Sequence, residues 1–170
     1  RVAIPFDSLN PHLVNALVAT EDVRYYKHSG IDFWALLRVG VKTVILQQSS
    51  SGGGSTLTQQ LAKQLYSGRN FEDVGKLGFY FRLFYYKMKE WLTAVRLERS
   101  YTKEEILAMY LNEYDFIYGA HGVEAAAQTY FGKFQTELTI EEAAMLVGML
   151  KNAVLYNPLR YPDNAMSRRN

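Results

Sequence analysis

Glu21 is the residue whose surroundings best suit proton-transfer chemistry. At about 100° per residue along the helix predicted there, it falls on the stripe of Val14 and Leu17 and not on the polar face. A carboxylate on an apolar stripe loses hydration, and in that setting a carboxyl group becomes an effective proton acceptor or donor. The alternative is an ordinary helix end at which Glu21 pairs with Arg24 or Lys27.

Three other ionisable residues are candidates for the same site. Asp22 projects about 100° away from Glu21, so the two should have separate roles. Glu90 shares a helix face with Lys87, which fits either a functional site or an ordinary surface ion pair. His28 could be a base or a ligand, but no second His, Cys or carboxylate stands at metal spacing with it, so a packed histidine that holds a loop is favoured.

The segment Gly52–Thr56 suits an anion, and in particular a phosphate. Its glycines let the backbone approach a ligand, and its last two residues offer N-cap oxygens to a helix that starts at about Leu57. The helix start presents N–H groups and a positive dipole end, and Lys63 follows roughly two turns later. The Gly-Lys-[Ser/Thr] ending of a nucleotide P-loop is absent. The alternative is a flexible loop, which the polar run Gln47–Ser51 favours.

The segment Phe79–Tyr86 holds six aromatic residues in eight. Tyrosines interleaved with Phe, Leu and a cation are typical of a membrane interface, where the apolar bodies enter the acyl boundary. The alternative is a core helix that supplies bulk. The run is apolar on all sides, which favours the interface.

Composition excludes several classes of protein. The 170 residues carry 19 Lys+Arg against 17 Asp+Glu, and a net charge of +2 is too small to indicate a nucleic-acid partner. No run reaches the roughly 18 apolar residues of a membrane span, and there is no cysteine from which to infer a redox compartment. The abrupt ends suggest a fragment of a longer, membrane-anchored chain.

Helical signals dominate the elements that must position these residues. Capping residues mark four helix starts: Asn10 with Pro11, Asp32, Thr102 with Glu105, and Thr139 with Glu142. The helix after Asp32 carries an apolar series of Trp34, Leu37, Val41 and Ile45. A long helix is expected over about 81–98, a polar loop over 67–76, and a strand signal only over 2–4. The sequence therefore predicts a mainly α fold with little β structure.

The motifs, taken together, resemble the peptidoglycan glycosyltransferases of family 51, which occur as monofunctional enzymes and as domains of class A penicillin-binding proteins. Five segments match in the family's order over nearly the whole chain: Glu21–Gly30, Gly53–Lys63, Lys87–Glu90, Tyr110–Lys133 and Leu138–Pro158. Two positions depart from the family pattern. Tyr86 stands where the third motif usually has an arginine, and Ile117 follows Phe116 where the family often has glycine.

The resemblance implies one glycosyltransferase domain over residues 1–170, lysozyme-like, with a substrate cleft. It implies polymerisation of lipid II into glycan strands on the outer, periplasmic face of the cytoplasmic membrane, with inversion at the anomeric carbon. It also implies a transpeptidase domain as one option for the full-length chain. The rival functions are a lysozyme-like glycan-cleaving enzyme and a non-catalytic lipid II or glycan-binding module.

The resemblance also implies roles for the site residues. Glu21 would be the catalytic base. Glu90 would be the second catalytic residue and would serve the second part of the cleft, where it orients pyrophosphate ligands or a metal. The remaining candidates would bind substrate: Asp22, His28, Gly53, Gly54, Ser55, Thr56, Gln59, Gln60, Lys63, Lys87 and Asn112, the last with an equally open structural role. A divalent cation, Mg²⁺ or Mn²⁺, could assist at the pyrophosphate near Glu90, and no organic cofactor is expected. The aromatic segment 79–86 would contact the membrane.

Overall fold

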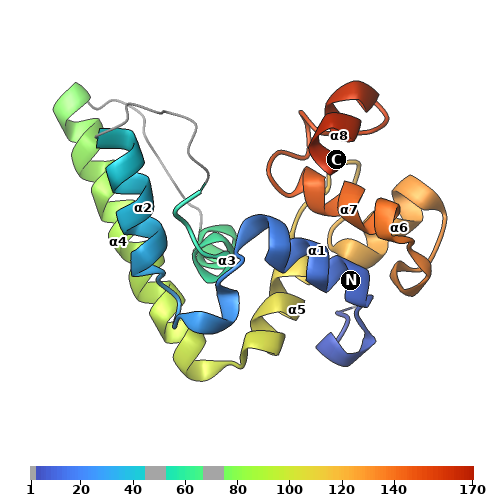
Figure 1. Ribbon diagram of the computed structural model, residues 1–170, viewed down its shortest axis with the longest axis horizontal. Coiled ribbons are helices and arrows are strands. Elements are labelled where there is room, and N and C mark those ends of the chain that lie inside the picture. The colour runs from blue at the N-terminus through green and yellow to red at the C-terminus, as the bar shows by residue number, and fades with distance from the viewer. Residues whose placement is uncertain (1–2, 45–52, 67–74) are drawn as a thin grey trace. The chain divides into compact units, whose positions relative to one another are not determined.

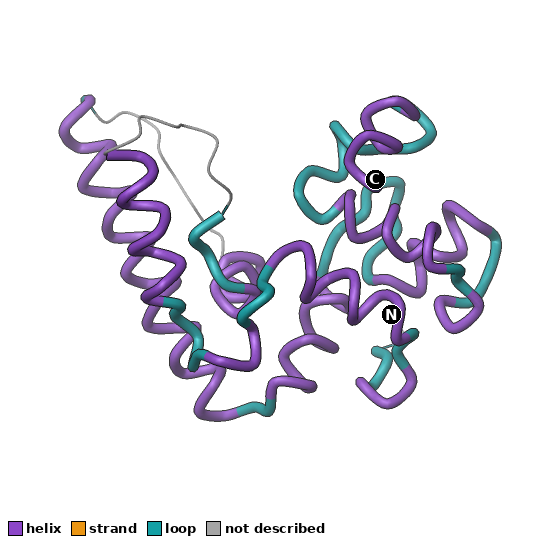
Figure 2. Tube along the Cα trace, viewed as in Figure 1, coloured by secondary structure: helices purple, strands orange, loops and turns teal. Residues whose placement is uncertain are grey.

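The computed structural model describes residues 3–44, 53–66 and 75–170, and this part of the chain is built from helices and connecting loops (Figures 1 and 2). The helices are α1 (Pro11–Glu21), α2 (Phe33–Val44), α3 (Leu57–Tyr66), α4 (Lys76–Ser100), α5 (Lys103–Glu113), α6 (Val123–Phe131), α7 (Ile140–Met149) and α8 (Pro162–Arg169), with short 3₁₀ turns at Phe6–Ser8, Tyr25–Lys27 and Gln135–Glu137. The mainly α prediction is confirmed. The strand expected over 2–4 is wrong for its two described residues, Ala3 and Ile4, which are in no strand.

The helices belong to two compact units. The first comprises Arg1–Val23 and Leu107–Asn170, and in it α1 packs on α7 and α7 on α8. The second comprises Arg24–Ile106, and in it α3 packs on α4. The boundary falls within α5, whose first turn belongs to the second unit. Each unit contains some of the predicted site residues.

The start of α1 is held by a buried asparagine. The side chain of Asn10 accepts a hydrogen bond from the backbone N–H of His12 at 2.8 Å, and Pro11 occupies the first helical position, as predicted. The same side chain donates to the carbonyls of Gln135 (3.0 Å) and Leu138 (2.9 Å). The cap therefore also fixes α1 against the loop before α7, and so sets where the far end of α1, with Glu21, lies in the first unit.

The other predicted caps are also confirmed. Asp32 accepts from the amides of the residues two and three positions later, and Thr56 accepts from the amide of Gln59 at 3.2 Å. The pairs Thr102–Glu105 and Thr139–Glu142 each form a reciprocal capping box.

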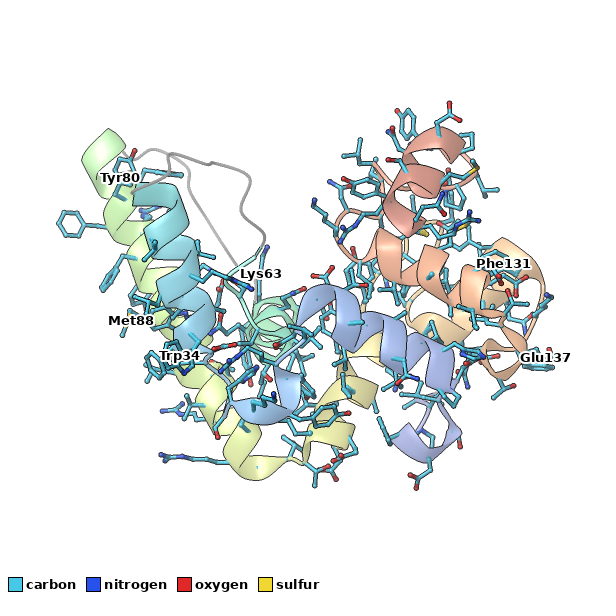
Figure 3. The ribbon with its side chains drawn as sticks, viewed as in Figure 1. Trp34, Lys63, Tyr80, Met88, Phe131 and Glu137 are labelled. Atoms are coloured by element: carbon cyan, nitrogen blue, oxygen red, sulfur yellow. The ribbon has the colours of Figure 1, made fainter. Side chains whose placement is uncertain are left out.

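Large apolar side chains are exposed on two helices of the second unit. On α4 the exposed aromatic residues include Phe79, Tyr80, Phe81, Phe84 and Tyr85. On α2 the exposed apolar residues include Phe33, Trp34, Leu37 and Val41, while Ile45 lies outside the described residues. Figure 3 draws Trp34, Tyr80 and Met88 on these helices. The alternative of a core-filling helix is therefore wrong for these α4 aromatics, and the apolar series of α2 also faces solvent.

The long helix extends beyond its predicted ends, to Lys76–Ser100. Lys76, assigned from sequence to a polar loop, is its first residue; the rest of that loop, apart from Gly75, lies outside the described residues. Among the described residues, no helix combines the length and apolarity that a membrane span requires.

Candidate functional site

Glu21 is the last residue of α1, and its side chain is 15% exposed. Its position on the apolar stripe therefore removes most of the side chain from water, as predicted. Its Oε1 accepts a hydrogen bond from Nη2 of Arg168 at 3.3 Å, and Arg168 is supplied by α8, 147 positions later in the chain. The sequence suggested only the nearby Arg24 and Lys27 as partners.

The charge of Glu21 helps to raise the pKa values of two tyrosines, one in α5 and one in the loop after it. Burial raises the pKa of Tyr110 well above its usual value, and the charge of Glu21 adds to this effect. Burial raises the pKa of Tyr114 to about 12, with Glu21 acting in the same direction against a hydrogen bond to the Ala153 backbone. Both phenols therefore stay protonated at neutral pH. They can donate hydrogen bonds, as Tyr114 does to the Met149 carbonyl at 3.0 Å, but they cannot serve as bases.

Asp22 and Asn112 also lie in the first unit. Asp22 is buried and caps the C-terminus of α1, with its backbone N–H bonded to the Val18 carbonyl at 3.2 Å. The side chain of Asn112 accepts from the amide of Ile4 at 3.0 Å and donates to the Ile4 carbonyl at 2.8 Å. These contacts support the structural role for Asn112, and its binding of substrate stays a prediction.

The glycine loop of the second unit is anchored through one carbonyl. Thr56 Oγ1 donates to the Gly30 carbonyl at 2.7 Å, and Gln59 Nε2 donates to the same oxygen at 3.3 Å. Gly30 has φ +90, and a Cβ there would lie 3.0 Å from the backbone of Ala94, so the position requires glycine. The end of the loop is therefore fixed between the start of α3 and the middle of α4.

His28 and Gln60 are two further predicted site residues of the second unit. His28 is half-buried and packs edge-on against Tyr25 with ring centroids 6.1 Å apart, which agrees with a packed histidine near Gly30. Gln60, on α3, is half-buried.

Lys87 connects α4 to the glycine loop. Its Nζ lies 2.8 Å from Oε2 of Glu90 and donates to Oγ of Ser55 at 3.3 Å. Glu90 is only 7% exposed, so this pair is not the ordinary surface ion pair that the sequence allowed. The structure thus brings together Ser55, Lys87 and Glu90, with Thr56 and Gln59 on the same loop and helix.

Other residues of the loop, and Lys63 of α3, are partly or fully exposed to solvent. Gly53 is exposed and Gly54 is half-buried beside Val39, where a Cβ would lie 3.3 Å from Cγ2. Lys63, in the last turn of α3, is exposed, and Figure 3 labels it. Backbone N–H groups, an exposed ammonium and the Lys87 ammonium together suit an anion.

The donor set does not fit a protein-held metal ion. No group of three or more His, Cys, Asp or Glu gathers within the described ranges. The one candidate ligand, Glu90, is held by the Lys87 ammonium, which would compete with a cation. The divalent cation stays a prediction.

These features define a mainly α protein with a half-buried carboxylate in one unit and, in the other, a glycine loop whose donors suit an anion. The Transglycosylase family model matches residues 1–170, and the chain belongs to this family, the family 51 glycosyltransferases that the motifs resembled. Family membership supports a glycosyltransferase of peptidoglycan synthesis.

Penicillin-binding proteins of several bacteria are similar to the chain over its whole length. The chain is 41% identical to penicillin-binding protein 1A of Aquifex aeolicus over 170 residues, which is the whole chain and 22% of that protein. It is 38% identical to penicillin-binding protein 1A of Escherichia coli over 170 residues, the whole chain and 19% of the relative. It is 40% identical to penicillin-binding protein 1B of Haemophilus influenzae, over the whole chain and 21% of the relative. The chain thus spans about a fifth of the length of these relatives.

Arg168, Tyr110 and Tyr114 are the neighbours of Glu21 that the sequence analysis did not identify. The two tyrosines lie in or beside the fourth motif, but nothing in their spacing indicates a contact with α1. The paired arginines at 168 and 169 were visible as cations, yet no local rule connects one of them to a residue so far away in sequence.

Proposed function

We propose that the chain polymerises the glycan of lipid II. In this reaction the 4-hydroxyl of an acceptor sugar attacks the anomeric carbon of a donor linked α to polyprenyl pyrophosphate. The new bond is β-1,4, so the anomeric centre inverts. The observation that carries the proposal is the family match over all 170 residues.

Glu21 is the base in this proposal. A hydroxyl is a weak nucleophile until its proton is taken, and a carboxylate in a partly dehydrated position suits that task. As the acceptor oxygen bonds to the anomeric carbon, its proton passes to the carboxylate of Glu21, and the bond from that carbon to the pyrophosphate oxygen breaks. The burial of Glu21 at the end of α1 supports this role.

The leaving pyrophosphate carries negative charge that fixed donors and cations must stabilise. Lys63, the Gly53–Thr56 backbone and Lys87 suit that task. Glu90 acts through Lys87, which it holds 2.8 Å away beside Ser55. With the loop anchored on Gly30, the donors need little rearrangement when the charge develops.

A lipid-linked donor requires that the enzyme act at a membrane surface, and we propose the outer, periplasmic face of the cytoplasmic membrane. The exposed aromatic residues of segment 79–86 would enter the interface, so that the polyprenyl chain can stay in the bilayer. A longer chain with a transpeptidase domain fits relatives that are about five times as long.

The test is polymerisation of labelled lipid II by the wild type and by Glu21→Gln. We expect the variant to lose polymerisation and remain folded, because glutamine has nearly the shape of glutamate but cannot accept the proton. Glu141→Gln, an exposed carboxylate of the same unit, is the matched control and should turn over normally. Near-normal polymerisation by Glu21→Gln would remove Glu21 from the mechanism.

Two additions to the assay test the divalent cation and the rival functions. A chelator arm tests the divalent cation, and a parallel incubation with purified glycan strands tests the rival hydrolase. Release of fragments from the strands without polymerisation of lipid II would favour the hydrolase. Binding of lipid II without either reaction would favour the binding module.

Lys63→Ala tests the pyrophosphate site separately. If Lys63 binds the leaving group, the variant should weaken donor binding more than acceptor binding, because only the donor carries pyrophosphate. Equal losses at both subsites would count against Lys63 as the phosphate ligand.

A further inference from the structure

Arg168 is the cation that α8 brings to Glu21. Its Nη2 lies 3.3 Å from Oε1 of Glu21, and the two side chains are 27% and 15% exposed. A charge-assisted hydrogen bond between partly buried groups is less screened by water than a surface pair. The contact can therefore restrict the carboxylate to one orientation.

The packing of α8 places this side chain with little freedom. α8 packs on α7 and α7 packs on α1 (Figure 1). Ala165 of α8 is buried. A Cβ at Gly148 of α7 would lie 3.3 Å from Cγ of Arg168, so the absence of a side chain there makes room for the arginine stem. The packing of α1, α7 and α8 in the first unit therefore positions the guanidinium of Arg168.

The arginine is not optimised as a purely structural ion pair. Its Nε is buried and has no hydrogen-bond partner among the described residues. A buried donor without a partner disfavours the folded state. The hydrogen bond that this side chain does make is directed at Glu21, the one carboxylate of α1.

We propose that Arg168 is a positioning residue for Glu21: it holds the carboxylate in the orientation that receives the acceptor proton. This inference rests on the proposed function, in which Glu21 is the base. Arg168 acts through Glu21. Its loss should therefore slow the chemical step and leave substrate binding nearly unchanged, because small displacements of a reacting group cost rate more than affinity.

The experiment compares Arg168→Met, Arg168→Lys and Arg169→Met with wild type in lipid II polymerisation, measuring kcat and KM. Methionine keeps an unbranched stem for the contact at Gly148, and lysine restores a charge without the guanidinium fork. Arg169 is the matched control, because it is the next residue of α8 and donates to Asn170. We expect Arg168→Met to lower kcat about tenfold with KM within about twofold, Arg168→Lys to recover part of kcat, and Arg169→Met to match wild type.

A second measurement needs no activity. In urea unfolding, the cycle of Glu21→Gln, Arg168→Met and the double variant should be non-additive, because Glu21→Gln removes the charge from the same contact that Arg168→Met removes altogether. Additive changes, or an unchanged kcat in Arg168→Met, would overturn the inference. If Arg168→Met does not fold, Arg168→Lys decides: a wild-type kcat combined with additivity in a Glu21→Gln, Arg168→Lys cycle would overturn it too.

The outcomes separate this inference from the proposed function. Loss of polymerisation in Glu21→Gln with a wild-type kcat in Arg168→Met would remove only the positioning role. Normal polymerisation in Glu21→Gln would remove the base assignment, whatever the result for Arg168.

Discussion

At the residue scale, the two carboxylates proposed for the reaction are each held by a cation from elsewhere in their own unit. Glu21 receives Arg168 from another helix, and Glu90 receives Lys87 from the preceding turn of α4. Burying a carboxylate costs hydration, and a nearby cation offsets part of that cost. Removing the cation should therefore matter more than for an exposed pair.

Lys87→Met tests this difference. We expect the free energy of unfolding to fall by about 1–2 kcal/mol, because Glu90 would lose the Lys87 ammonium while its side chain stays only 7% exposed. Lys133→Met is the control: Lys133 pairs with Glu142 at the same 2.8 Å, but the carboxylate is 20% exposed. That variant should lose less than about 1 kcal/mol. Urea unfolding measures both, and equal losses would show that burial of the carboxylate is not the deciding factor.

At the element scale, the start of α2 depends on the charge of Asp32. Burial alone would raise the pKa of this carboxyl, but the amides of Ala35 and Trp34 together with Arg24, 2.9 Å away, lower it below its usual value. The folded state thus binds its proton less readily than the unfolded chain. The stabilisation is complete above the unfolded-state pKa of about 3.9 and is lost as pH falls through the folded pKa.

Asp32→Asn separates the charge from the cap. Asparagine is an equally good N-cap, so α2 should still form, but the ion pair with Arg24 is lost. We expect about 1 kcal/mol less stability at pH 7, and a difference from wild type that shrinks below about pH 4. Asp32→Ala, which also loses the cap, should be less stable than Asp32→Asn by about 1 kcal/mol. A pH-independent gap between wild type and Asp32→Asn, measured by urea unfolding, would contradict the charge argument.

The loop between α5 and α6 carries backbone strain at a position where the family often has glycine. Ile117 has φ 61, in the left-handed region that a β-branched residue rarely adopts. The backbone at this position therefore has a conformation that glycine adopts easily, although the residue is isoleucine. The turn is closed by the amide of Phe116 donating to the Ala120 carbonyl at 2.9 Å, and by the amide of Ile117 donating to Asp115 at 2.8 Å.

Ile117→Gly and Ile117→Ala form a matched pair that isolates this strain. Both remove the isoleucine side chain, so their difference reports the backbone alone. We expect the glycine variant to be more stable than the alanine variant by about 1 kcal/mol in urea unfolding, against the usual order in which glycine is the less stable residue. An alanine variant as stable as the glycine one would mean that the loop relaxes out of the left-handed region.

The predictions of helix starts were correct where the interaction that decides them is local in sequence. An N-cap bond spans two or three residues, so Asn10, Asp32 and the two capping boxes could be identified from sequence. The contacts of Gly30 with Ala94 and of Arg168 with Glu21 could not, since they depend on how separate helices pack. The exposed series on α2 shows the same limit, because periodicity marks a stripe but does not say whether protein covers it.

At the scale of the whole molecule, the second unit exposes a run of aromatic side chains on α4 and further apolar ones on α2. Exposed apolar patches of this kind mark an interaction surface. The substrate cleft of the family stays a prediction.

Vesicle binding tests whether this surface contacts a membrane. Phe81 and Phe84 are 67% and 66% exposed, so Phe81→Ser with Phe84→Ser should leave the unfolding curve nearly unchanged. Loss of two aromatic side chains from the interface should weaken binding to anionic lipid vesicles by roughly tenfold or more, because their apolar area no longer leaves water. The matched control is Phe134→Ser with Ile140→Ser, two first-unit residues each 62% exposed. Equal weakening by both double variants would indicate non-specific hydrophobic adsorption, and unchanged binding by the Phe81, Phe84 variant would remove α4 from the membrane contact.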